Sequence, residues 1–124
     1  MKSFLTATAL IEGATGLALA IVPAWVVSIL LNQTLTEPAG IIIGRLAGAA
    51  LITLALACWL SGTHPNSSVM LKAMFLYNVF ATILLLYAGV INHNAGPGLW
   101  PAIIIHLGML IWGTVQWRKL RALA

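Results

Sequence analysis

Two residues of opposite charge stand inside apolar stretches of this chain, where charge is costly. Glu12 interrupts the first apolar run, and Arg45 interrupts the second. A charged side chain at membrane depth needs water or a partner, and it often marks a proton, ion or ligand path. At 1.5 Å per helical residue the two positions differ in depth by about 9 Å, a gap that two long side chains can close. We therefore expect Glu12 and Arg45 to pair in the interior.

Two further polar residues lie at comparable depths in the later apolar runs. Asn78, in the third run, is level with Glu12, and His106, in the fourth, is level with Arg45. Lipid cannot satisfy such groups, so they should turn inward. We predict one interior network, a candidate ligand or proton path made of Glu12, Arg45, Asn78 and His106. The competing hypothesis is that this network only holds the helices in register.

Each run also carries a weakly polar stripe at helical spacing, which should face the interior for the same reason. The stripes are Thr8, Glu12 and Thr15 in the first run, Arg45, Ala49 and Thr53 in the second, Asn78 and Thr82 in the third, and His106, Met109, Gly113 and Gln116 in the fourth.

Residue counts argue against most catalytic sites. Glu12 and Glu37 are the only acidic residues and lie at different depths, which disfavours paired-carboxylate catalysis. Cys58 is the only cysteine, so neither an intrachain disulfide nor a thiolate metal cluster can form. There is no glycine-rich phosphate loop, no HExxH pair and no Ser-His-Asp arrangement. We expect no catalytic residue, no metal site and no cofactor, and hence no enzymatic activity of the chain's own.

His106 raises the question of haem, because neutral imidazole is a common iron ligand. Ligation by two histidines needs a second one at membrane depth on a facing helix, and both His64 and His93 lie in polar connectors. One chain therefore cannot supply the pair, although two copies could. The alternative is a hydrogen-bonded interior histidine.

Glycines form a second pattern, which concerns helix packing. Gly40, Gly44 and Gly48 recur at spacing four in the second run, and Gly13 and Gly16 lie in the first. Small residues at this spacing let two membrane helices approach closely. The pattern predicts that this smooth face packs against another helix, and it makes the face a candidate for binding a partner subunit.

The elements that must position these residues are membrane-spanning helices. Hydrophobic residues make up 61% of the 124 positions and charged residues only 6%, against roughly 25% charged in soluble domains. Four apolar runs are long enough to cross a hydrocarbon core of roughly 30 Å. We predict an all-α integral membrane four-helix bundle, a single domain over residues 1–124, with spans at about 4–22, 39–60, 69–91 and 99–117.

A shorter apolar segment at 24–31 follows Pro23 and cannot cross. We expect a short helix lying in the membrane interface, the alternative being an extension of the first span beyond a proline kink.

Charge distribution predicts the orientation of the spans. All the Lys and Arg residues near span ends fall on one side of a four-span arrangement, namely Lys2, Lys72, Arg118, Lys119 and Arg121. By the positive-inside rule both termini are then cytoplasmic. The net charge of +4 forms no basic face, so we expect no nucleic-acid partner.

Over its whole length the chain resembles small four-span bacterial inner-membrane proteins that are loosely DoxX-like. The likeness rests on Ile11-Glu-Gly-Ala-Thr-Gly16, Pro23-Ala-Trp25 and Gly44-Arg-Leu-Ala-Gly-Ala-Ala50. It implies a four-span fold in the bacterial inner (plasma) membrane and no reaction. The small multidrug transporters are similar in size and also carry a glutamate midway along the first span. Their aromatic and glycine signature is missing from the third span here, Tyr77-Asn-Val-Phe-Ala-Thr82.

Three functions are compatible with these patterns. The leading expectation is a non-catalytic protein that binds an apolar or amphipathic ligand, or a partner subunit, through its polar interior. The first alternative is a small proton-coupled transporter in which Glu12 carries the proton. The second is a membrane anchor of a redox complex, touching quinone or haem near His106. We expect membrane lipid as a partner, and a homo-oligomer or a subunit of a membrane complex.

Overall fold

The computed structural model describes residues 1–62, 64 and 67–122, which form helices and connecting segments without any strand. The helices are α1 (Lys2–Ile21), α2 (Pro23–Leu31), α3 (Pro38–Ser61), α4 (Ser67–Leu86), the π-helix η1 (Tyr87–Ile91) and α5 (Leu99–Ala122). Among the described residues, α1, α3, α4 with η1, and α5 are each long and apolar enough to cross a membrane. The chain is therefore an all-α, multi-pass membrane protein, as its composition predicts.

The helix ends follow the apolar runs closely. The largest difference is in α5, which continues past the predicted end at Trp117 to Ala122. Lys119 and Arg121 lie in its last turn, where cations complement the negative end of the helix dipole. Part of the predicted connector at 61–68 lies outside the described residues.

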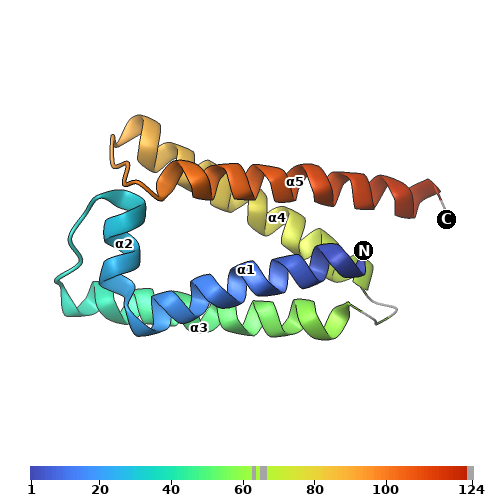
Figure 1. The fold of residues 1–124 in the computed structure, drawn as a ribbon, viewed down its shortest axis with the longest axis horizontal. Coiled ribbons are helices and arrows are strands. Elements are labelled where there is room, and N and C mark those ends of the chain that lie inside the picture. The colour runs from blue at the N-terminus through green and yellow to red at the C-terminus, as the bar shows by residue number, and fades with distance from the viewer. Residues whose placement is uncertain (63, 65–66, 123–124) are drawn as a thin grey trace.

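Pro23 begins a separate helix and does not extend α1 beyond a kink. Val22 has φ −129° and ψ 57°, outside the helical region, because a residue before proline clashes with the ring in a helical conformation. From there α2 turns away from α1 and lies across one end of the molecule (Figure 1). The kinked-extension alternative is thereby excluded.

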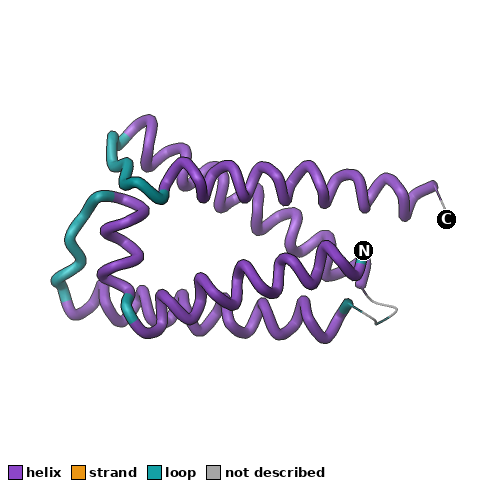
Figure 2. The backbone as a smooth tube through the Cα atoms, viewed as in Figure 1, coloured by secondary structure: helices purple, strands orange, loops and turns teal. Residues whose placement is uncertain are grey.

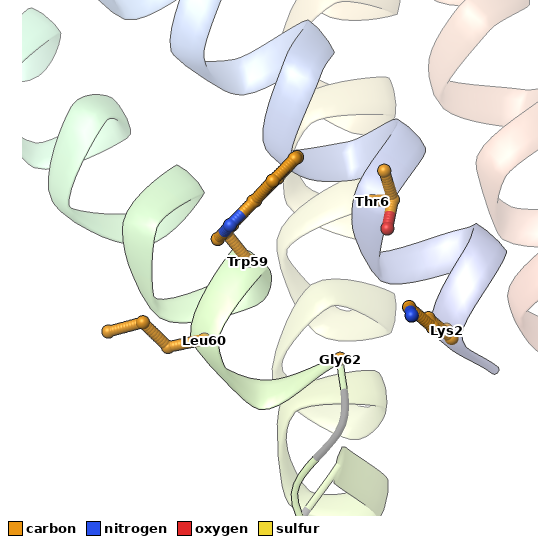
Figure 3. A pocket seen from close by; sticks show the side chains of 5 residues that line it. All are labelled: Lys2, Thr6, Trp59, Leu60 and Gly62. Carbon is orange, nitrogen blue, oxygen red and sulfur yellow. The ribbon is translucent and has the colours of Figure 1, made fainter.

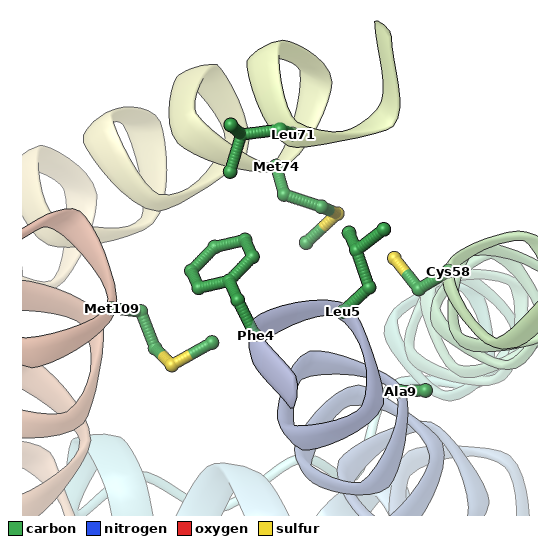
Figure 4. Packing of buried hydrophobic residues seen from close by; sticks show 7 residues of the cluster. All are labelled: Phe4, Leu5, Ala9, Cys58, Leu71, Met74 and Met109. Atoms are coloured by element: carbon green, nitrogen blue, oxygen red, sulfur yellow. The ribbon is translucent and has the colours of Figure 1, made fainter. Parts of the chain in front are cut away.

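The spans are arranged as two antiparallel pairs, α1 with α3 and α4 with α5 (Figure 1). The pairs meet in one apolar core near the start of α1, to which all four spans contribute (Figure 4). Its buried side chains are Phe4, Leu5 and Ala9 of α1, Cys58 of α3, Leu71 and Met74 of α4, and Met109 of α5. The Phe4 ring meets Trp112 edge to face, with centroids 5.6 Å apart. This core fixes the position of α1 against α4 and α5.

At the opposite end α2 is bonded to the connector between η1 and α5. The Gly96 N–H donates to the Leu30 carbonyl at 2.9 Å, and the Gly98 N–H donates to the Ile29 carbonyl at 3.0 Å. A Cβ at Gly96 would collide with the Ile29 carbonyl oxygen, so this close approach requires glycine. Figure 2 shows α2 and the two neighbouring loops gathered at this end. The helix pairs are thus joined at both ends, by side chains at one and by backbone at the other.

Candidate ligand or proton site

Four polar side chains meet where α1, α4 and α5 come together. The Tyr77 hydroxyl donates to Glu12 Oε2 at 3.1 Å, and His106 Nδ1 lies 2.9 Å from Asn78 Oδ1. The rings of Tyr77 and His106 meet edge to face with centroids 5.9 Å apart, which connects the two hydrogen-bonded pairs. We call Glu12, Tyr77, Asn78 and His106 the polar cluster.

Burial makes this cluster costly to maintain. Glu12 is 4% exposed and Asn78 is 1% exposed, while Tyr77 and His106 are half-buried. Removing a carboxyl group from water is unfavourable unless hydrogen bonds replace those it loses. The phenol of Tyr77 supplies one such bond to Glu12.

Hydrogen bonding fixes which ring nitrogen of His106 carries a proton. The Asn78 side-chain nitrogen donates to the Met74 carbonyl at 2.7 Å, so its oxygen is the atom that faces His106 Nδ1. An amide oxygen can only accept, and Nδ1 must therefore carry the hydrogen. In the neutral ring the other nitrogen, Nε2, is left with a free lone pair.

Arg45 is not part of the polar cluster, and the predicted interior pair with Glu12 is wrong. Its side chain is exposed on α3, and no ion pair joins it to Glu12 within the described residues. Arg45 lies only about 10 Å from the start of α3 at Pro38, since each helical residue adds about 1.5 Å. From such a depth a long side chain can extend along the helix toward polar surroundings, so it needs no interior partner.

The small-residue face of α3 determines which side of the helix is buried. A Cβ on Gly48 would lie 2.6 Å from the Gly16 carbonyl oxygen of α1, so these backbones almost touch. Arg45, Ala49 and Thr53, predicted to face inward, are turned away from this contact and exposed. Thr53 tolerates exposure because its hydroxyl donates to the Ala49 carbonyl at 2.9 Å.

The same face continues toward α2. A Cβ at Gly44 would lie 2.8 Å from Pro23 Cβ, and one at Gly40 would lie 2.6 Å from Leu35 Cδ1. Gly13 has more room, with an added Cβ at an ordinary 3.5 Å from the nearest atom of α3. Because Gly44 and Gly48 pack inside the chain, they are not available to a partner subunit.

The other predicted stripes are buried or partly buried: Thr8, Thr15, Thr82, Met109, Gly113 and Gln116. Thr82 differs from the rest, because its Oγ1 is buried with no hydrogen-bond partner in the described part of the chain. The hydroxyls of Thr8 and Thr15 donate to the carbonyl four residues earlier. A buried hydroxyl without a partner typically costs about 1–3 kcal/mol. A polar atom supplied near Thr82, one turn beyond Asn78, would therefore be stabilising.

Two grooves lie away from the polar cluster, at the end that holds the chain termini. One, of about 440 Å³, is lined by Lys2, Thr6, Trp59, Leu60 and Gly62 (Figure 3). Trp59 reaches from α3 toward α1 there, whereas Leu60 points away from α1. The other, of about 320 Å³, is lined by Phe75, Thr114, Trp117, Arg118 and Arg121.

Tyr77 is the one cluster member that the polar pattern does not predict. Its position beside Asn78, at the depth of Glu12, is the signal by which it could have been found. Three of the four site residues predicted from the sequence, Glu12, Asn78 and His106, therefore meet in the structure. Tyr77 takes the place expected for Arg45 as the partner of Glu12.

The cluster combines a carboxyl group, a phenol, an imidazole and an amide in apolar surroundings. Such a set can hold the polar head of a ligand by hydrogen bonds, or hold and release a proton. No protein-family model matches this chain, and no curated protein or solved structure matches it either.

Proposed function

We propose that this chain binds a small amphipathic molecule in the membrane without transforming it, and that the polar cluster receives the molecule's polar head. The observation that carries the proposal is the meeting of Glu12, Tyr77, Asn78 and His106 midway along three apolar spans. Glu12, for example, is about 15 Å from the start of α1 at 1.5 Å per residue. Polar groups at that depth are costly, and a bound ligand is one reason to retain them.

The atoms of the polar cluster that still lack a hydrogen-bond partner within the part of the chain that the structure describes indicate which kind of ligand head group would bind there. Glu12 has a second carboxyl oxygen that makes no hydrogen bond among the described residues, and neutral His106 has a free lone pair on Nε2. Both accept hydrogen bonds, and the unpartnered hydroxyl of Thr82 can accept or donate. A hydroxyl or amine head suits such a set, with an apolar tail lying among the spans.

The test is to identify what the purified protein retains. The full chain is purified in mild detergent and extracted with organic solvent, and the extract is analysed by mass spectrometry. We expect one amphipathic species at a near-stoichiometric level, lost in His106→Leu. Thr53→Ala is the control, because Thr53 is exposed and its hydroxyl donates to the Ala49 carbonyl of its own helix. A parent protein that retains only detergent and bulk phospholipid would contradict the proposal.

A second candidate function is proton-coupled transport with Glu12 as the carrier. The exposure of Arg45 favours it, because a carboxyl group without a fixed cation is free to exchange a proton. The test is proton flux into liposomes that hold the protein and a pH-sensitive dye, driven by a pH step. Flux should be abolished by Glu12→Gln and retained by Arg45→Gln. Equal flux with parent and Glu12→Gln would exclude this function.

We further propose that the chain lies in a bacterial inner membrane with both termini in the cytoplasm and α2 in the opposite interface. In support, α1 starts, α4 starts and α5 ends at the same end of the molecule (Figure 1). Five of the six Lys and Arg residues lie near these helix ends, and Arg45 is the exception. Cytoplasmic ends of spans are enriched in such residues.

A further inference from the structure

The groove at the end of the α4 and α5 pair concentrates cations and aromatic rings. Its volume is about 320 Å³, and its lining residues are Phe75, Thr114, Trp117, Arg118 and Arg121. The four from α5 follow the spacing i, i+3, i+4 and i+7, which places them on one helix face. Phe75 comes from α4 and provides the opposite wall.

Aromatic contacts join the α4 and α5 sides of the groove. Phe75 and Trp117 meet edge to face with ring centroids 5.6 Å apart. The guanidinium of Arg121 lies over the Trp117 ring, 5.8 Å from its centroid, at the distance of a cation–π contact. The cation is therefore held beside an apolar surface.

The two arginines are not neutralised by acidic side chains in the groove. The chain has only two, Glu12 and Glu37, and neither lines the groove. Arg118 and Arg121 are both exposed, so their N–H donors are accessible from outside the protein. A guanidinium presents paired donors that match the oxygens of a phosphate group.

We propose that this groove is a binding site for the phosphate of an anionic phospholipid. Arg118 and Arg121 hold the phosphate oxygens, and Phe75 and Trp117 contact the glycerol and the first carbons of an acyl chain. The groove lies where α5 passes from its apolar stretch into the basic segment, the level at which lipid headgroups meet a membrane helix. An aromatic wall next to paired cations suits a lipid better than free phosphate. This site is separate from the polar cluster.

The test compares lipid binding by the full chain in detergent, measured as adducts in native mass spectrometry. Phosphatidylglycerol should bind to the parent at least about tenfold more tightly than phosphatidylcholine, since each basic residue near a membrane surface attracts an anionic headgroup. The double variant Arg118→Gln/Arg121→Gln should lose this preference. Lys72→Gln/Lys119→Gln is the matched control: it removes one charge near the start of α4 and one near the end of α5 without changing a lining residue. It should keep the preference.

Two further measurements separate the alternatives. Phosphatidylglycerol with brominated acyl chains should quench tryptophan fluorescence in the parent and quench less in Trp117→Phe. Arg118→Lys/Arg121→Lys keeps the charge but loses the paired donors, and it should bind with intermediate affinity. Equal losses in the two glutamine variants would show diffuse attraction without a built site. Full competition by inorganic phosphate at the lipid's own concentration would show an anion site and overturn the lipid assignment.

Discussion

Gly16 of α1 and Gly48 of α3 lie so close together that neither position has room for a side chain. A Cβ on Gly16 would lie 2.8 Å from the Gly48 carbonyl oxygen, and a Cβ on Gly48 would lie 2.5 Å from the Ala20 nitrogen. These neighbours belong to the main chain and cannot rotate aside. The contact therefore sets the register of the α1 and α3 pair.

Gly48→Ala should lower the free energy of unfolding by about 1–3 kcal/mol, the usual cost of overpacking a close contact. The measurement is denaturant unfolding of the purified protein in detergent micelles. Gly108→Ala is the control, because beyond the adjacent turns of its own helix no atom of the described residues lies within 4 Å of a Cβ added there. It should be neutral or slightly stabilising, since alanine favours a helix more than glycine does. Equal stability of Gly48→Ala and the parent would mean that the two helices separate without cost.

Tyr77→Phe should destabilise the protein by about 1–3 kcal/mol, because it leaves a buried carboxyl group without its hydrogen-bond donor. Tyr87→Phe makes the same chemical change at an exposed residue of η1 and should have little effect. Unfolding in detergent measures both. A loss of the same size in the two variants would argue against the bond from Tyr77 to Glu12.

Arg45→Gln should change the free energy of unfolding by no more than about 0.5 kcal/mol, as expected for an exposed residue away from packed contacts. In a double-mutant cycle with Glu12→Gln the two changes should add to within about 0.5 kcal/mol. A coupling above about 1 kcal/mol would show that the two residues meet after all, as their spacing in the sequence predicts.

His106 should carry its proton on Nδ1. In a sample with ¹⁵N-labelled histidine, Nδ1 should show the chemical shift of a protonated ring nitrogen and Nε2 that of an unprotonated one. His106→Leu identifies the signals, and Asn78→Leu should remove the Nδ1 signature because the acceptor oxygen is gone. A protonated Nε2 beside a bare Nδ1 would mean that the Asn78 amide is oriented the other way.

The orientation of the chain can be tested with a reporter fused after Ala124. A reporter that is active only in the cytoplasm should give a signal, because the basic residues near that end favour the cytoplasmic side. The same reporter inserted into the connector between η1 and α5 should be silent. Signals in the reverse pattern would place α2 and its loops in the cytoplasm.

The positions of the helices could be predicted from the sequence because the length of each hydrophobic run and the residues that bound it determine them. Each run is bounded by proline, by polar residues or by a basic segment, and helix ends such as Pro38 follow these boundaries. The inward placement of Glu12 and Asn78 was likewise predictable, because lipid satisfies neither.

The partners within the site could not be predicted in the same way. A pair between Arg45 and Glu12 requires that α3 turn its polar stripe inward, but the orientation of α3 is set by close packing at Gly48. A long cationic side chain can extend from within the membrane to polar surroundings, so it does not require a particular helix face to be buried. A close glycine contact between two backbones forms in only one rotational orientation of the helix about its axis. The bonds from Gly96 and Gly98 to α2 depend on how the two pairs lie in space, which no local pattern encodes.

The pairing of α1 with α3 and of α4 with α5 divides the chain at its middle. Everything needed for the first pair has been synthesised once α3 ends at Ser61, and the second pair begins only at Ser67. The first pair can therefore assemble in the membrane while the second is still on the ribosome. Until α4 and α5 arrive, the inner face of α1, with Phe4 and Glu12, remains open to lipid or to an assisting membrane protein.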